Sequence, residues 1–256
     1  MPDAQGIAAQ LVELHALAAA PGAVPPVAAG HLHQRIHRLL SKNPAIRNDV
    51  LQAIPEDLRP RVASLSTATG RIAKTVTKAR RTIPAWTITS PPSVAQLRGW
   101  YDEAAATTGT PWTVLAAVHL VETRFGRLQG ISHAGAMGPM QFIPETWARF
   151  GEGDILDPRD AIHAAGRHLA AHGAAKDLRK ALWHYNQSTA YVDAVVAYHE
   201  QLVADPSVLG LLVSWQVYVR TTSGLAWMDE GTSLDATVPA STWCADVAHW
   251  CEPEGG

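Results

Sequence analysis

An excess of charge of either sign is missing from this chain. Its 21 lysines and arginines nearly balance its 23 aspartates and glutamates over 256 residues. Nucleic-acid-binding domains carry a strongly basic face, so we expect no nucleic-acid partner. A short basic run at residues 71–81 is most simply the solvated face of a helix, and attraction to an anionic polymer is the other interpretation.

Long apolar runs and early basic residues are missing too. No stretch is long and apolar enough to cross a bilayer, so we expect no membrane span. The first lysine or arginine is Arg35, so the basic start of a secretory signal peptide is absent. Taken literally, these absences describe a cytoplasmic protein.

Cysteine is scarce, with only Cys244 and Cys251 in the chain. On one continuous helix these residues would lie about 10 Å apart along the axis, too far for a disulfide. Across a turn they could be bridged, and an oxidised pair would support export. Trp243 and Trp250 share the same spacing, so a turn and a helix face both remain open.

Helical periodicity, helix caps and breaking prolines run through most of the sequence, which predicts a mainly α fold. Most segments between the predicted helices are short, as in a compact helical domain. Helices are expected at residues 1–20, 31–42, 44–53, 58–82, 94–108, 111–125, 144–150, 158–172, 176–185 and 189–204.

The prolines also divide the chain. Pro84 and the pair at residues 91–92 mark a linker, so residues 1–92 are expected to be a helical accessory region with its linker. Residues 93–205 form the next section. In residues 206–256 the pattern changes to alternation around a turn at residues 221–224, which predicts a β-hairpin followed by a loose tail from Met228 onward.

Glu122 stands out in the apolar helix predicted at residues 111–125. At 100° per residue it points the same way as Leu115 and lies one turn past Val118, toward the buried side. A poorly solvated carboxyl has a raised pKa and can stay protonated near neutral pH. Such an acid can protonate the leaving oxygen of a glycosidic bond. Taken alone, a salt-bridged residue at a helix edge would be the simpler interpretation.

Two later segments favour the catalytic interpretation. Gly138-Pro139-Met140-Gln141 begins sixteen residues after Glu122, in a region whose glycines permit tight turns. The Gln141 amide suits sugar hydroxyls and N-acetyl groups. His184-Tyr185-Asn186 then places a phenol beside an amide.

Glu122-Thr123 and these two segments resemble, in order and spacing, the motifs of lytic transglycosylases of the SLT type, relatives of goose-type lysozyme. The resemblance covers about residues 95–203 and implies a lysozyme-like helical domain. The flanking sections resemble those of actinobacterial cell-wall proteins that carry this domain.

The resemblance implies a role for each matching residue. Glu122 corresponds to the catalytic acid and base, and Tyr185 to the tyrosine whose hydroxyl lies near the catalytic carboxyl. Thr123 replaces the commoner serine, Pro139 stiffens a turn that usually has leucine, and Ile143 stands where some relatives have methionine. The implied substrate-binding residues are Thr123, Ser132, Met137, Gly138, Met140, Gln141, Tyr185 and Asn186.

The implied reaction cleaves the β-1,4 bond between N-acetylmuramic acid and N-acetylglucosamine and leaves a 1,6-anhydromuramyl end. Ordinary glycosidases use two carboxylates, and the candidate second acids Asp154, Asp157 and Asp160 lie more than thirty residues beyond Glu122. One alternative is a lysozyme-type hydrolase that uses Asp154 or Asp160. The other is a non-catalytic protein that binds peptidoglycan in the same cleft.

The implied partners are peptidoglycan glycan strands, and the implied location is secreted or in the cell envelope, with the leader absent from this chain. We expect a monomer without a cofactor or metal. His33 and His37 lie four residues apart on a helix near His31, and a solvated surface pair is expected, because a metal site wants three or four ligands. The nine tryptophans are expected in the core unless one or two stack on sugar rings.

Overall fold

The computed structural model describes residues 3–20, 25–76 and 78–252. Helices make up 58% of it and the sheets are small, which confirms the mainly α fold with C-terminal strands. The N-terminal helices are α1 (Ala4–Ala19), α2 (Val27–Lys42), α3 (Pro44–Ala53) and α4 (Arg59–Ala73). The later helices are α5 (Val94–Thr108), α6 (Trp112–Thr123), α7 (Pro144–Phe150), α8 (Pro158–Ala171), α9 (Leu178–Tyr185), α10 (Thr189–Ala204), the 3-10 turn η1 (Pro206–Val208), α11 (Leu209–Val213) and α12 (Ala240–Ala245).

The strands are short, and they pair with one another in the antiparallel sense. The predicted hairpin is confirmed, because β4 and β5 pair from Val217 with Met228 to Thr221 with Gly224. The strands are β1 (Thr82–Ile83), β2 (Thr87–Ile88), β3 (Leu128–Gln129), β4 (Val217–Thr221), β5 (Gly224–Met228), β6 (Val238–Pro239) and β7 (Cys251–Glu252), paired as β1–β6, β2–β3 and β4–β5–β7.

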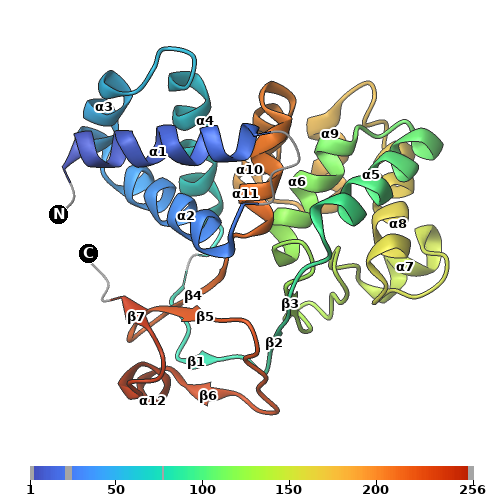
Figure 1. The fold of residues 1–256 in the computed structure, drawn as a ribbon. Helices are drawn as coiled ribbons and strands as arrows, with labels where there is room; N and C mark the ends of the chain where they lie inside the picture. Colours follow the sequence, from blue (N-terminus) through green and yellow to red (C-terminus); the bar gives the residue numbers. More distant parts are fainter. Residues whose placement is uncertain (1–2, 21–24, 77, 253–256) are drawn as a thin grey trace.

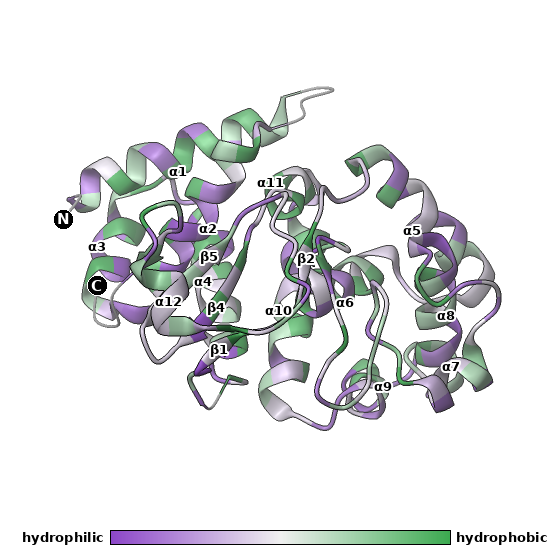
Figure 2. Cartoon of the chain, turned by 90° about the horizontal axis from the view of Figure 1, so that it is seen from below, coloured by the Kyte–Doolittle hydropathy of each residue, from purple (hydrophilic) through white to green (hydrophobic). Residues whose placement is uncertain are grey.

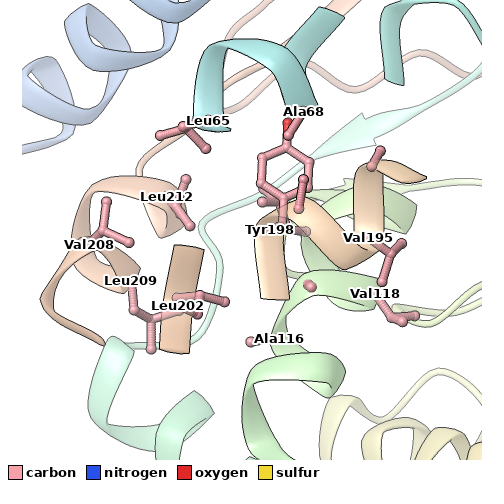
Figure 3. Close-up of a cluster of buried hydrophobic side chains, with 14 of the residues drawn as sticks. Leu65, Ala68, Ala116, Val118, Val195, Tyr198, Leu202, Val208, Leu209 and Leu212 are labelled. Atoms are coloured by element: carbon pink, nitrogen blue, oxygen red, sulfur yellow. The ribbon is translucent and has the colours of Figure 1, made fainter. Parts of the chain in front are cut away.

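Helix α10 lies at the centre of the helical core, between α4 on one side and α6 on the other (Figure 3). Tyr198 and Leu202 of α10 are fully buried, as are Leu65 of α4 and Val118 of α6. Burial of a leucine-sized side chain stabilises a fold by about 1.5–3 kcal/mol. The N-terminal helices and the later helices therefore share one continuous apolar core.

A second, smaller core lies within the β strands, below the helices in Figure 1. It contains Ile83 of β1, Ile88 of β2, Val219 of β4 and Met228 of β5, together with Trp243 of α12. In the view from below, α12, β1 and β4 lie in front of α2 and α4, at the opposite end from α7 and α8 (Figure 2). We call the strands and helix α12 that build this smaller core the β module.

The expectation of one helix over residues 58–82 is wrong in its second half. Helix α4 ends at Ala73, and the Thr75 hydroxyl bonds to the carbonyl of Ile72 at its end. The basic run beyond it leads into β1, which pairs with β6 more than 150 residues later. Part of the expected linker is likewise β2, paired with β3. Such distant pairing leaves no local periodic signal.

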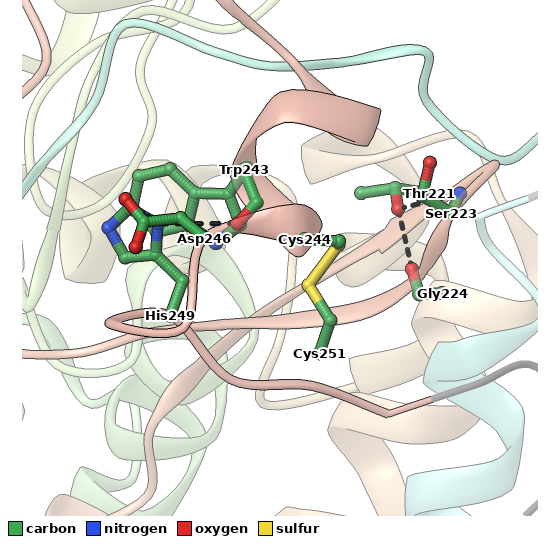
Figure 4. Close-up of a disulfide and its surroundings, with 8 residues drawn as sticks. All are labelled: Thr221, Ser223, Gly224, Trp243, Cys244, Asp246, His249 and Cys251. Atoms are coloured by element: carbon green, nitrogen blue, oxygen red, sulfur yellow. Dashed lines mark hydrogen bonds and ion pairs between the residues drawn. A yellow bond between two sulfur atoms is a disulfide. The ribbon is translucent and has the colours of Figure 1, made fainter.

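The expectation of a loose tail from Met228 onward is also wrong. Strand β6, helix α12 and strand β7 follow, and Trp243 is buried. Cys244 and Cys251 form a disulfide with 5.4 Å between their Cα atoms (Figure 4). The chain turns between them, and the Trp243 ring stacks on His249 at 3.6 Å between centroids. Covalent closure and ring stacking therefore order this segment despite its irregular sequence.

Candidate active site

Glu122 lies in the last turn of α6, an almost wholly buried helix. Every residue from Thr113 to Leu120 is buried, because α6 packs against α5, α8 and α10. The helix ends at Thr123, one residue after Glu122, and the next two residues, Arg124 and Phe125, take left-handed φ angles of 55° and 61°. This sharp end leaves Glu122 at the edge of the core, where it lines a cleft.

Among the described residues, one donor bonds to the Glu122 carboxyl: the hydroxyl of Tyr191 on α10, at 2.7 Å from Oε1. Burial raises the pKa of Glu122 to about 7, although the Tyr191 bond favours the carboxylate and acts in the opposite direction. The raised pKa predicted from the helix pattern is thus confirmed. Burial and the nearby Glu122 charge raise the pKa of Tyr191 well above its usual value, so its phenol remains a donor.

Burial and the nearby Glu122 charge also raise the pKa of the Tyr185 phenol, so Tyr185 lies near the carboxyl without bonding to it. Its hydroxyl donates to the backbone carbonyl of Met140 at 2.7 Å. Its ring lies almost parallel to that of Tyr191, with 6.5 Å between centroids. Tyr191, and not Tyr185, therefore bonds to the acid. Tyr191 follows the Ser188 cap of α10, whose hydroxyl accepts from the Tyr191 backbone N–H.

The turn at residues 138–141 is joined to the end of α6. The Thr123 hydroxyl donates to the carbonyl of Pro139 at 2.5 Å and accepts from the N–H of Gly126 at 2.9 Å. Gly138 has a φ of 76°, and a Cβ there would lie 2.0 Å from the carbonyl oxygen of Ile155. The turn therefore needs glycine both for its backbone angle and for its close contact.

Gln141 is held in place by the same turn. Its side-chain amide donates to the carbonyls of Gly138 and Gly130 at 3.0 and 3.3 Å. Its own φ is 50°, uncommon for a residue with a side chain. These two bonds leave the amide oxygen of Gln141 on the cleft wall without a partner among the described residues.

The structure brings some of the predicted binding residues together at the cleft and leaves others behind it. The predicted residues on the cleft wall are Thr123, Ser132, Gln141 and Asn186, together with Glu122. Within the described residues, Met137, Gly138, Met140 and Tyr185 lie off this wall. Met140 is fully buried and Met137 pairs with Phe142, so these four residues shape the wall from behind.

The cleft of about 1320 Å³ extends well beyond the predicted residues. Its far wall comes from α2, α4, β4 and the segment before β2, which includes Trp86. Trp215 also lines it, whereas Trp183 is 43% exposed on the surface, against the expectation of a core residue. These wall residues could not be found from local sequence, because they reach the cleft only through the long-range packing of the fold.

Glu122 is the only acidic residue among the described cleft-lining residues. The candidate second acids instead hold the loop before α8. Asp157 caps α8 by accepting from the N–H of Asp160, as the sequence predicts. Asp160 accepts from the N–H of Asp154, whose own carboxylate accepts from Leu156. Helix capping and loop bonding therefore account for these carboxylates.

His33 and His37 are fully buried, which corrects the expectation of a solvated pair. With His15 they place three ring nitrogens within 4.8 Å of one another. The indole N–H of Trp215 donates to Nδ1 of His33, so the proton of neutral His33 lies on Nε2 and points at Nε2 of His37. A metal on Nε2 of His33 would set its Nδ1–H against the indole N–H. The donors therefore fit a hydrogen-bonded chain that ends on Ser66 better than a metal site.

Residues 100–205 match the family model of the transglycosylase SLT domain. This part of the chain is similar to the SLT domain of transglycosylases. Helix α6, the turn at residues 138–141, α9 and α10 all lie inside the matched range. Helices α2 and α4 and the β module, which complete the cleft, lie outside it.

Curated relatives match shorter stretches of the chain. Over 80 residues the chain is 35% identical to the membrane-bound lytic murein transglycosylase F of Thiobacillus denitrificans, covering 31% of this chain and 17% of that protein. Over 73 residues it is 32% identical to the membrane-bound lytic murein transglycosylase F 1 of Alkalilimnicola ehrlichii, covering 28% and 15% respectively. The match thus spans about a sixth of these relatives. No solved structure matches the chain significantly.

Proposed function

We propose that this protein is a peptidoglycan lytic transglycosylase in which Glu122 acts first as acid and then as base. The observation that carries the proposal is the position of Glu122. It is the only acidic residue among the described cleft-lining residues, and its pKa is raised to about 7. The SLT domain and the printed names of the relatives support the substrate class.

In the proposed reaction, protonated Glu122 transfers its proton to the oxygen between N-acetylmuramic acid and N-acetylglucosamine. The C1–O bond breaks and the N-acetylglucosamine hydroxyl leaves. The substrate's own N-acetyl group stabilises the cationic C1 centre. The Glu122 carboxylate then removes the proton of the muramyl 6-hydroxyl, whose oxygen bonds to C1. The product is a 1,6-anhydromuramyl end, no water is consumed, and Glu122 is protonated again.

Tyr191 has a positioning role in this scheme. Its hydroxyl bond fixes Oε1 of Glu122 and stabilises the carboxylate that forms after the first proton transfer. The turn at residues 138–141 and Asn186 supply polar groups on the same wall for the sugar substituents. Thr123, Ser132 and Gln141 are proposed to act there, with Met137, Gly138, Met140 and Tyr185 supporting them from behind.

The proposed location is the cell envelope, where peptidoglycan lies. The disulfide between Cys244 and Cys251 supports it, because disulfides persist in oxidising compartments. No helix in the described ranges is long and apolar enough to span a membrane. Residues 1–92 are proposed to be an accessory region that builds the far wall of the cleft.

The test is mass spectrometry of purified peptidoglycan after digestion with the wild-type protein and with Glu122→Gln. Anhydromuropeptides from the wild type alone are expected. Reducing muramyl ends that disappear in Glu122→Gln would instead identify a muramidase, and Asp154→Asn and Asp160→Asn would then be the variants to test. Equal release by both proteins would refute a role for Glu122 as the acid, and no release by either would favour a binding protein.

A further inference from the structure

The cleft is cationic although the whole chain has a formal net charge of −2. Five basic residues line it among the described residues, namely Arg38, Lys42, Arg80, Arg124 and Arg220. Against them stands Glu122 alone, which is partly protonated near neutral pH. A cleft lined by charges of one sign concentrates its field on ligands of the opposite sign.

Arg38 presents an unused guanidinium to this cleft. It comes from α2, and its CZ atom lies 4.4 Å from the centroid of the Tyr218 ring on β4. Within the described ranges its guanidinium makes no hydrogen bond or ion pair, although Glu252 of β7 acts on it at longer range. A guanidinium carries five N–H donors in a planar fork that matches a carboxylate. Stacking on Tyr218 holds the plane and leaves its edge available.

Arg124 faces the same space from the end of α6. Its guanidinium makes one hydrogen bond in the described ranges, from Nη1 to the carbonyl of Leu120 at 2.6 Å, and it has no carboxylate partner there. Burial lowers the pKa of Arg38 and of Arg124, and the Arg124 charge lowers that of Arg38 further. Both guanidiniums are partly buried, so a bound anion would offset their mutual repulsion.

We infer that Arg38 and Arg124 form an anion subsite of the cleft that binds a carboxylate on the muramyl substituent of the glycan strand. The inference rests on the proposed function for the identity of the strand. Two sources have this chemistry, the lactyl carboxylate of a peptide-free strand and the carboxylates of a stem peptide. Arg124 follows Glu122 by two residues, so an anion bound there ties the strand beside the acid.

Binding is measured by calorimetry with the full-length Glu122→Gln protein, which removes turnover from the experiment. Three oligomers of equal length are compared: a peptide-bearing glycan, a peptide-free glycan with lactyl carboxylates, and an uncharged N-acetylglucosamine oligomer. Both charged oligomers are expected to bind about tenfold more tightly than the neutral one, as for a charge-assisted pair partly open to solvent. Preference for the peptide-bearing oligomer alone would assign the stem peptide as the source.

Adding Arg38→Gln to the Glu122→Gln protein is expected to remove the tenfold preference for charged oligomers and to leave the affinity for the neutral oligomer unchanged. Arg35→Gln is the matched control, because Arg35 lies on the same helix but is exposed, stacks on Trp250 and lies off the cleft wall among the described residues. An equal loss for neutral and charged oligomers, or an equal loss in Arg35→Gln, overturns the inference.

Two further results keep the inference independent of folding and of the proposed reaction. If the variant with Arg38→Gln fails to fold, the Glu122→Gln protein by itself still tests the inference. Equal affinity of that protein for charged and neutral oligomers at low salt would refute an anion subsite. If the wild type forms anhydro products but charged oligomers show no Arg38-dependent preference over the neutral one, the anion subsite is refuted and the transglycosylase reaction is not. An Arg38-dependent preference without anhydro products would refute the transglycosylase reaction alone.

Discussion

The hydroxyl of Tyr191 lies 2.7 Å from Oε1 of Glu122, although the two residues are 69 positions apart in the chain. The bond joins α10 to the last turn of α6. It has one electrostatic effect: it stabilises the charged form of Glu122 against the burial that raises its pKa. The acid strength of Glu122 is therefore set by two opposing contributions from different elements.

Tyr191→Phe is expected to move the pH dependence of activity. Without the hydroxyl, the carboxylate loses a donor, so the pKa of Glu122 rises above about 7. In the proposed reaction the protonated acid is required, so activity should fall as pH rises through this pKa. In a plot of kcat/KM against pH, the falling limb should thus shift to higher pH. The maximal rate should also drop about tenfold or more. Tyr185→Phe, whose hydroxyl bonds to Met140, should leave the position of the limb unchanged.

Glu122→Gln is expected to stabilise the fold at high pH. The pKa of Glu122 is about 7 in the folded protein and near 4.5 when unfolded. Between these values the folded state holds a proton that the unfolded state has lost, so the free energy of unfolding falls as pH rises through this window. The loss is on the order of 3 kcal/mol. Urea unfolding should give similar stabilities for the wild type and the variant at pH 4, and a more stable variant at pH 8. The same difference in free energy of unfolding at both pH values would contradict this prediction.

Gly138→Ala is expected to destabilise the protein by at least about 2 kcal/mol and to impair activity, because the added Cβ meets a backbone oxygen at a left-handed φ. Gly135→Ala is a matched control, with a φ of 77° but no atom within 4 Å of its Cβ position. It should cost only about 1 kcal/mol, the backbone contribution. Denaturant unfolding and digestion assays check both, and equal losses would show that the contact with Ile155 does not matter.

Reduction of the disulfide is expected to weaken the β module by about 2.5 kcal/mol, the loop-closure value for a short loop. Thermal unfolding with and without reductant measures the effect on the wild type. A Cys244→Ser, Cys251→Ser double variant should unfold at the temperature of the reduced wild type and should not respond to reductant. No change on reduction would mean that the stacking of Trp243 on His249 suffices to hold the segment.

Local patterns predict the helices well. The expected ranges 94–108 and 144–150 coincide with α5 and α7, since Ser93 caps α5 and Pro144 begins α7. The position of Glu122 and its raised pKa also follow from helix geometry. Tyr191, Trp86 and Arg38 could not be assigned to the site, because each reaches it through packing between distant segments. The same holds for β1 and β2, whose partners lie far along the chain.

Helix α10 is covered by other helices on both sides, which bury its side chains Val195, Tyr198 and Leu202. A fragment cut to the matched residues 100–205 would keep α6 but lose α4. One flank of α10 would then meet water, with Tyr198 and Leu202 among its newly exposed side chains. Such a fragment would be prone to self-association, so the unit recognised by similarity is smaller than the unit that this chain needs to stay folded and soluble.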